Sequence, residues 1–469
     1  MKVLLVSPNR EHLPDPVFPL GLSYIASALR KHDHDVRIID LCFSEDMDRE
    51  IQTVISDFQP DAIGMSLRNI DDVCFPKQHS YLEEYRTTTS SLRRYSSAPI
   101  VLGGSGFTIM PEAFMQELGA DFGIIGEGEK AFPELLEKIT SLAPSLVRRE
   151  AEIRGAAAGH VLPPLQGGIE GGIGRIISSR SRIKDLDRIT PDRELFDSSS
   201  YYRLGGMLNI QTKRGCPFRC VYCTYPQIEG RTVRMRSPGS VADEIADVIE
   251  KTGSHHFFFV DSIFNYPVSH AKAICEEIIR RGLNIQWSCY ANPAHMTVDL
   301  ADAMVRAGCT AVEFGTDSLV DGMLRNMGKS FTFSKVRKAS AICKKSGLKF
   351  CHFIFAGSQG DTDETIDLTL ARLEEIEPDA AVIMAGIRIF PGTVLAAHAK
   401  QDLGIADIGL EPVFYHSRTL TDYDKVAEAV SKKKNWIMPG YEINFHPRLQ
   451  KKLRKHGIKG SLWEGLSKR

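Results

Sequence analysis

The sequence predicts an α/β protein in which a doubly wound parallel sheet precedes a partial (β/α)6 barrel and a small C-terminal region. Three observations predict this class. Short apolar runs alternate with amphipathic helical segments through residues 1–143, the alternation stops over residues 144–200, and it resumes from about residue 205. Such alternation is typical of βαβ units, whose crossover helices cover a parallel sheet.

Length and composition limit the possible functions. At 469 residues the chain is too long for one ordinary core, so we expect two or three domains. A net charge of −1 demands neither nucleic acid nor a membrane as partner, and no apolar run reaches the length of a membrane span. Met1–Val6 is interpreted as a buried strand rather than a signal peptide, so the ten cysteines are expected in a reducing cytoplasm.

The first domain is expected over residues 1–143, with helices at 20–31 and 129–140. Its expected strands are Lys2–Val6, Asp35–Asp40, Asp61–Ser66, Pro99–Gly103 and Asp121–Ile125. Residues 144–200 are glycine-rich and without periodicity, and are interpreted as a linker or an extended crossing segment.

The barrel is expected over residues 201–410, and residues 411–469 form the C-terminal extension. The expected barrel strands are Met207–Thr212, His256–Asp261, Ile285–Tyr290, Ala311–Gly315, Phe350–Phe355 and Ala381–Arg388. Ser237 and Pro238 suit the N-cap and first turn of one barrel helix. The tail from Ser431 holds eleven Lys or Arg against two Glu, which indicates a solvated basic face, a cover for the barrel mouth, or contact with an anionic surface.

Three of the cysteines stand within eight positions, directly after the first barrel strand. Cys216, Cys220 and Cys223 therefore lie on a loop at the functional end of the barrel, where Lys213, Arg214 and Arg219 favour thiolates. A structural zinc site needs a fourth ligand, and no Cys or His follows within the next thirty residues. Three thiolates can instead hold an iron–sulfur cubane and leave one iron open to another ligand.

The spacing Cys-x3-Cys-x-aromatic-Cys after a barrel strand resembles the radical S-adenosylmethionine (SAM) enzymes. The resemblance implies a 4Fe–4S cluster whose open iron chelates SAM, and reductive cleavage of SAM to methionine and a 5′-deoxyadenosyl radical. It extends over residues 1–400 and is similar to the branch of these enzymes that carries a cobalamin-binding domain. The segments that match this branch are Pro19-Leu-Gly-Leu, Val101-Leu-Gly-Gly, Gly126-Glu-Gly-Glu, Arg214-Gly-Cys-Pro, Val260-Asp-Ser-Ile-Phe-Asn, Glu313-Phe-Gly-Thr-Asp-Ser and Phe390-Pro-Gly-Thr.

The resemblance also implies which residues contact the two larger cofactors. For SAM these are Tyr222, Asp261, Asp317, Ser318 and Gly357. For cobalamin they are Ser7, Ser66, Gly103, Gly104, Ser105, Gly126 and Glu127. From the residues alone, the Gly103–Gly106 run either lets backbone N–H groups approach a phosphate or nucleotide tail, or forms a tight strand–helix turn.

Three features qualify these assignments. Asp317 stands where many relatives carry glutamate, and the Asp-x-His-x-x-Gly corrinoid signature is absent. The lower axial position of cobalt is thus left to water, to nothing, or to a residue such as His12, and we assign no cobalt ligand. Arg234 and Arg236 are interpreted as surface arginines beside a proline-led helix rather than as anion ligands.

The function implied is a cobalamin-dependent radical SAM C-methyltransferase that methylates an unactivated carbon. One alternative keeps both domains but uses the radical for cyclisation, coupling or rearrangement. Another is a non-catalytic iron–sulfur electron carrier or a zinc-binding module, although either should present four ligands. We expect a small-molecule or lipid-like substrate and a reductant such as a flavodoxin or ferredoxin; the sequence does not identify the substrate.

Overall fold

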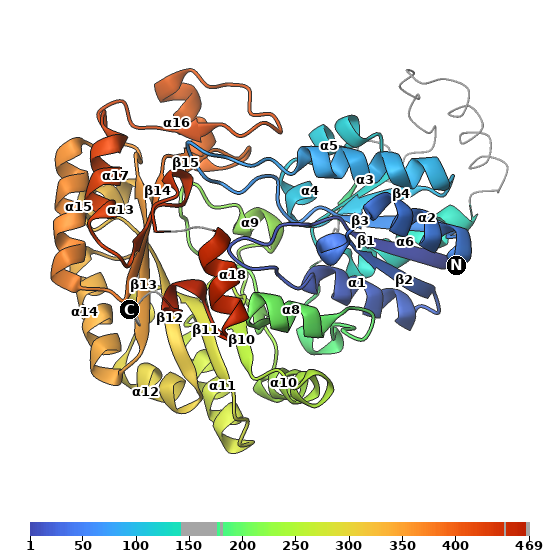
Figure 1. The fold of residues 1–469 in the computed structure, drawn as a ribbon, viewed down its shortest axis with the longest axis horizontal. Coiled ribbons are helices and arrows are strands. Elements are labelled where there is room, and N and C mark those ends of the chain that lie inside the picture. Colours follow the sequence, from blue (N-terminus) through green and yellow to red (C-terminus); the bar gives the residue numbers. More distant parts are fainter. Residues whose placement is uncertain (142–175, 179–181, 445–446, 466–469) are drawn as a thin grey trace.

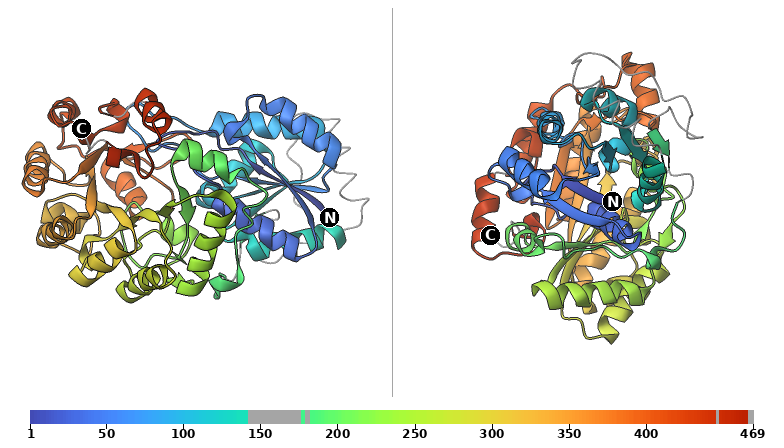
Figure 2. Two further views of the ribbon diagram at one scale, coloured as in Figure 1. Left: turned by 60° about the horizontal axis from the view of Figure 1, so that its bottom comes forward. Right: turned by 90° about the vertical axis from the view of Figure 1, so that its right-hand side faces the viewer.

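The computed structural model describes residues 1–141, 176–178, 182–444 and 447–465. Two lobes lie side by side, with the N-terminal sheet in one and the barrel in the other (Figures 1 and 2). Both lobes consist of parallel strands and covering helices, so the predicted α/β class with a doubly wound sheet and a partial barrel is confirmed.

The first lobe has a sheet of parallel strands in the order β2-β1-β3-β4-β5-β6. Their bounds are β1 (Lys2–Ser7), β2 (Asp35–Asp40), β3 (Ala62–Ser66), β4 (Ile100–Gly103), β5 (Phe122–Ile125) and β6 (Ile176–Ser178). One face packs against α1 (Leu20–Lys31) and α6 (Gly128–Ser141), and the other against α2 (Met47–Phe58), α3 (Leu82–Tyr95) and α5 (Pro111–Leu118). Covering both faces of apolar strands in this way makes a doubly wound sheet.

The barrel sheet has the strand order β17-β14-β13-β12-β11-β10-β7, and each described pair is parallel. Its strands are β7 (Leu208–Ile210), β10 (His256–Phe259), β11 (Gln286–Ala291), β12 (Cys309–Asp317), β13 (Lys349–Ala356), β14 (Ala380–Ala385) and β17 (Trp436–Ile437). Its covering helices include α10 (Pro238–Thr252), α11 (Val268–Arg280), α12 (Val298–Arg306), α14 (Phe333–Ser346) and α15 (Asp363–Ile376). Helix α10 begins as expected, because the Ser237 hydroxyl accepts from the Ser240 N–H and Pro238 occupies the first turn.

Two short strands lie where the sequence indicated none. Strand β6 is in the segment interpreted as a linker and pairs with β5; β17 is in the C-terminal region and pairs with β14. Neither exceeds three residues, so no alternating pattern could have indicated them. Consequently the C-terminal region contributes a strand to the barrel sheet.

The remaining helices and short strands complete the chain. They are α4 (Ser105–Ile109), α8 (Ser198–Gly205), α9 (Tyr225–Ile228), α13 (Asp321–Asn326), α16 (Val394–Leu403), α17 (Tyr423–Ser431), α18 (Pro447–Lys455), and the antiparallel pairs β8 (Lys213–Arg214) with β9 (Arg234–Met235) and β15 (Ile387–Arg388) with β16 (Phe414–Tyr415). Helix α18 is held to the first lobe by a buried ion pair between Arg454 and Asp15, 2.5 Å long. The C-terminal region therefore joins both lobes.

Candidate functional site

A cavity of about 1210 Å³ lies where the carboxyl ends of the first sheet meet the barrel. All seven residues predicted to contact cobalamin line it: Ser7, Ser66, Gly103, Gly104, Ser105, Gly126 and Glu127. The interior of the barrel contributes the opposite wall, including Phe258, Tyr290 and Phe353. Ligands of open α/β sheets bind at these strand ends, so this cavity is the candidate site.

The glycines after β4 have different structural roles. At Gly104, φ is +98°, and an added Cβ would lie 2.5 Å from the carbonyl oxygen of Leu67. The turn itself therefore requires glycine there. At Gly103 an added Cβ would meet only the Ile124 carbonyl oxygen, at 3.9 Å. The turn therefore does not require glycine at position 103. The absence of a side chain there leaves space in the cavity.

The Glu127 side chain is engaged by the other lobe. Its Oε1 lies 2.6 Å from Arg234 Nη2 and 3.6 Å from Arg214 Nη1, and its Oε2 accepts from Arg234 Nη1 at 3.0 Å. Burial would raise the pKa of the Glu127 carboxyl, but Arg234 and Arg214 hold this pKa below its usual value. Glu129 adds a second contact, 2.6 Å from Arg214 Nη2. Glu127 therefore lies on the cavity wall as part of an ionic contact between the lobes.

The cysteine loop is closed at its base by the antiparallel pair of β8 and β9. At Gly215 φ is +95° and a Cβ would collide with the Thr232 carbonyl, so only glycine fits this turn. The Gly215 N–H donates to Glu229 at 2.9 Å, and the Cys216 N–H to the Gly230 carbonyl at 3.0 Å. These contacts fix the loop independently of any bound group.

The three thiols are near enough to influence one another. Burial, with smaller contributions from Cys220 and Cys216, raises the pKa of Cys223 to about 12, and Lys329 acts in the opposite direction. Burial also raises the pKa of Cys216. Within the described residues, no three His, Cys, Asp or Glu side chains converge to hold a single metal ion. In a cubane each thiolate binds a different iron, so the three thiols need not converge on one ion to hold a cluster.

Tyr222, beside the third cysteine, belongs to a buried network at the end of β12. Its hydroxyl donates to Asp317 Oδ2 at 2.8 Å, and Lys329 forms an ion pair with the same carboxylate. Burial alone would lower the pKa of the Lys329 amine, but Asp317 and Cys220 raise it above its usual value. Ser318 is buried next to Asp317, and its hydroxyl accepts from the Val320 N–H. The structure thus brings Tyr222 and Asp317 into contact, with Ser318 next to Asp317 in the chain.

Lys329 is a residue that the sequence reasoning missed. It places a positive charge close to two of the cysteines. The one nearby feature of the sequence that could have pointed to Lys329 is Gly328. Its φ is +71°, and a Cβ there would collide with the Arg219 carbonyl of the cysteine loop.

Asp261 lies apart from the cavity and is fully buried. Its Oδ1 accepts from the backbone N–H groups of Thr212 and Lys213, at 2.7 and 3.1 Å. Its Oδ2 accepts from the Thr212 hydroxyl at 2.5 Å and from Lys213 Nζ at 3.1 Å. Predicted as a SAM contact, Asp261 is held by the two residues that lead into the cysteine loop.

Gly357 directly follows β13, with φ of +100°. A Cβ there would collide with the hydroxyl of Tyr423, which belongs to the C-terminal region. His12 lies in a loop, with Nε2 2.6 Å from the Cys42 carbonyl oxygen.

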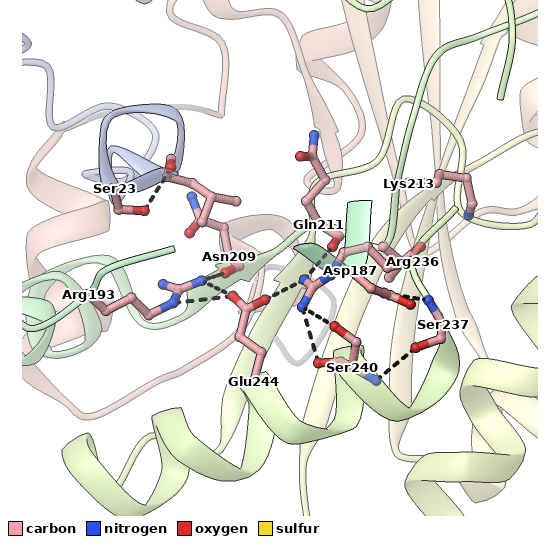
Figure 3. Close-up of polar contacts among 12 residues, drawn as sticks. Ser23, Asp187, Arg193, Asn209, Gln211, Lys213, Arg236, Ser237, Ser240 and Glu244 are labelled. Carbon is pink, nitrogen blue, oxygen red and sulfur yellow. Dashed lines mark hydrogen bonds and ion pairs between the residues drawn. The ribbon is translucent and has the colours of Figure 1, made fainter. Parts of the chain in front are cut away.

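The interpretation of Arg234 and Arg236 as surface residues is wrong, since both are buried. Figure 3 shows Glu244 of α10 between Arg193 and Arg236. Arg193 Nη2 lies 2.8 Å from Glu244 and also donates to the Asn209 carbonyl. Arg236 Nη1 forms an ion pair with Glu244 and donates to the Gln211 carbonyl at 3.0 Å. Buried guanidinium groups need such partners, and here they fix the end of β7, where the cysteine loop begins.

Two family models match the chain. Residues 7–136 match the B12 binding domain, and residues 210–373 match the radical SAM superfamily. The chain belongs to the cobalamin-binding radical SAM enzymes. These matches cover the cobalamin side of the cavity, the cysteine loop and the barrel strands β10 to β13, and they imply a 4Fe–4S cluster, SAM and cobalamin as the cofactors of this radical SAM enzyme.

Known proteins agree with this assignment. The tryptophan 2-C-methyltransferase of Streptomyces laurentii is 24% identical, over 87% of this chain and 76% of its own. The anaerobic magnesium-protoporphyrin IX monomethyl ester cyclase of Rubrivivax gelatinosus is 24% identical, over 81% of this chain and 67% of its own. The solved radical SAM methyltransferase TsrM of Kitasatospora setae, with tryptophan and a SAM analogue bound, shares the fold with a TM-score of 0.81 at 24% identity, covering 99% of this chain and 98% of that one.

No helix in the described part of this radical SAM enzyme is long and apolar enough to cross a membrane.

Proposed function

We propose that the chain transfers a methyl group from SAM to an unactivated carbon of a small molecule, as a cobalamin-dependent radical SAM C-methyltransferase. One observation carries the proposal: the seven residues assigned to cobalamin and the barrel interior line the same cavity. Arg214, Tyr225 and Glu229, which flank the cysteines, also line it. A methyl carrier and a substrate bound in this cavity would therefore be neighbours of the cysteine loop.

The residues present fit the implied cofactors. Cys216, Cys220 and Cys223 would hold the cluster, and the open wall at Gly103 suits close approach of a corrinoid. When bound, the cluster supplies the electron that cleaves SAM, and cobalamin supplies a carrier for the methyl group. Tyr222, Asp317 and Ser318 would bind SAM beside the cysteines. Asp261 would act indirectly, by fixing Thr212 and Lys213 at the start of the loop.

The second candidate is radical cyclisation, coupling or rearrangement with the same cofactors, and the match to a cyclase favours it. Both candidates require a reductant, for which a flavodoxin or ferredoxin is suitable. Free thiols throughout the described residues support a reducing compartment such as the cytoplasm.

The test uses protein purified anaerobically, with and without added hydroxocobalamin. We expect cluster-bound iron in both samples, cobalamin bound stoichiometrically in the loaded one, and retention of label from methyl-labelled SAM by the loaded protein only. A protein that binds iron and cobalamin and forms 5′-deoxyadenosine, but retains no label, would overturn methyl transfer in favour of the second candidate, and one that cannot be loaded with cobalamin would overturn both. An electron carrier or zinc module would form no 5′-deoxyadenosine.

A further inference from the structure

The inner end of the cavity lies inside the barrel and has an almost wholly apolar wall. Phe258, Tyr290, Phe353, Val382, Met384 and Trp463 line it. Trp463 comes from the C-terminal region, in a 3₁₀ turn that follows helix α18. Aromatic rings and aliphatic side chains of this kind bind the apolar body of a small molecule.

One carboxyl interrupts this wall. Glu313 projects from the middle of β12 and is 6% exposed. Its Oε1 accepts from Trp463 Nε1 at 2.8 Å, and Ser461 is a second hydrogen-bond partner. Among the described residues, no ion pair includes Glu313. A buried carboxylate without a cationic partner is costly, and folding alone offers no reason to keep one.

Two cations lie in the surroundings, and neither forms an ion pair with Glu313 within the described residues: Lys349, at the start of β13, donates to the Glu464 carbonyl at 3.2 Å, and Arg68 of the first lobe lines the same cavity near Tyr290. The titratable groups that act on Glu313 or respond to it are Tyr290 on β11, Cys351 on β13 and Glu464 beside Trp463, each neutral or acidic. Burial raises the pKa of Glu313 to about 7. The carboxyl is therefore ready to ionise when a cation arrives.

We propose that Glu313 and the aromatic wall form a subsite for a protonated amine on an apolar or aromatic body. The ammonium would pair with the free side of the carboxylate, and the rings would contact the body and add cation–π attraction. This inference rests on the proposed function, since it places the amine end of the substrate in the barrel, opposite the cobalamin wall. Trp463 and Ser461 hold the carboxylate in position for this contact.

The experiment compares two probes of similar shape, tryptamine and the neutral tryptophol. Their binding to cobalamin-loaded, SAM-free protein is measured by isothermal titration calorimetry at pH 8. We expect wild-type protein to bind tryptamine at least about tenfold more tightly than tryptophol, because a charge-assisted contact at a desolvated carboxylate is worth about that factor. Glu313→Gln should bring the ratio close to one while tryptophol binds as before.

A matched control keeps the result specific. Glu442 also lines the cavity, but it is exposed and pairs with Lys77, so Glu442→Gln should keep the preference for the amine. At pH 6 the wild-type preference should fall about tenfold, because Glu313 is then mostly protonated. Circular dichroism confirms that each variant is folded.

The inference fails if wild-type protein binds both probes equally or binds neither at millimolar concentration. It also fails if Glu313→Gln keeps the preference. Retention of label from methyl-labelled SAM is measured on the same preparations. Label retention without amine selectivity would overturn only the subsite, whereas loss of label retention in wild-type protein would overturn the proposed function.

Discussion

Replacing Gly103 by valine separates a cobalamin contact from a structural turn. An added Cβ has open space, because its nearest protein neighbour is the Ile124 carbonyl oxygen at 3.9 Å and Gly103 lies on the cavity wall. The free energy of unfolding should therefore change by no more than about 0.5 kcal/mol. A bound corrinoid would meet the new methyl groups, and overpacking typically costs about 1–3 kcal/mol. Cobalamin affinity should fall about 5- to 150-fold.

Absorbance titration with hydroxocobalamin measures the affinity, thermal unfolding measures the stability, and iron content reports on the cysteine loop. Gly104→Ala is the contrasting variant. Its Cβ would lie 2.5 Å from the Leu67 carbonyl oxygen at φ of +98°, so it should destabilise the fold by about 1–3 kcal/mol. If Gly103→Val binds cobalamin as tightly as wild-type protein, this wall does not contact the corrinoid and the reasoning is wrong.

Three further predictions concern the cysteine loop and the charged side chains around it. Cys216→Ala, Cys220→Ala and Cys223→Ala should each lose most of the cluster-bound iron and its absorbance, whereas Cys289→Ala, within the core, should keep both; wild-type iron content in a loop variant would contradict the cluster assignment. Lys329→Met should make the cluster harder to reduce, because a nearby positive charge favours the reduced form. Lys329→Arg should keep the midpoint potential of the wild-type protein. An unchanged potential in Lys329→Met would refute the contact between Lys329 and the cluster. Arginines hold the pKa of the Glu127 carboxyl below its usual value. The ionised carboxylate therefore contributes fully to the free energy of unfolding above about pH 4.5, and this contribution is lost as the pH falls through the lower pKa of the folded protein. Glu127→Gln should flatten this acid dependence of the unfolding free energy and, by leaving the buried Arg234 guanidinium without its carboxylate partner, destabilise the protein at pH 7 by about 3–5 kcal/mol.

Hydrophobic patterning was sufficient to predict the long strands of both sheets, because most of them, such as β1 and β14, are apolar runs buried on both faces. It could not predict β17, where two residues become a strand only through pairing with β14. Patterning also placed Asp261 correctly near the end of a strand. It could not show that Thr212 and Lys213 occupy both of its oxygens, because this depends on how two neighbouring strand ends meet.

Long-range partners explain the other differences. Arg234 looked like a surface residue because its partner, Glu127, is 107 positions away in the chain. Glu313 looked only like part of a family motif, and its contact with Trp463 spans 150 positions. Such pairs have no local signature, whereas the cysteine spacing does. The sequence could therefore predict the type of chemistry but not the side chains that surround it.

The contact between the lobes links the two predicted cofactor regions directly. Strands β8 and β9 close the cysteine loop, and each contributes an arginine, Arg214 and Arg234, to Glu127. Glu127 lies on the loop after β5 that lines the cobalamin side of the cavity. Both ends of the cysteine loop are thus tied to one residue of the opposite wall. Because separating the lobes would leave buried charges unpaired, this ionic contact helps to hold the two walls at one spacing, together with the buried pairs Arg454–Asp15 and Arg388–Asp71.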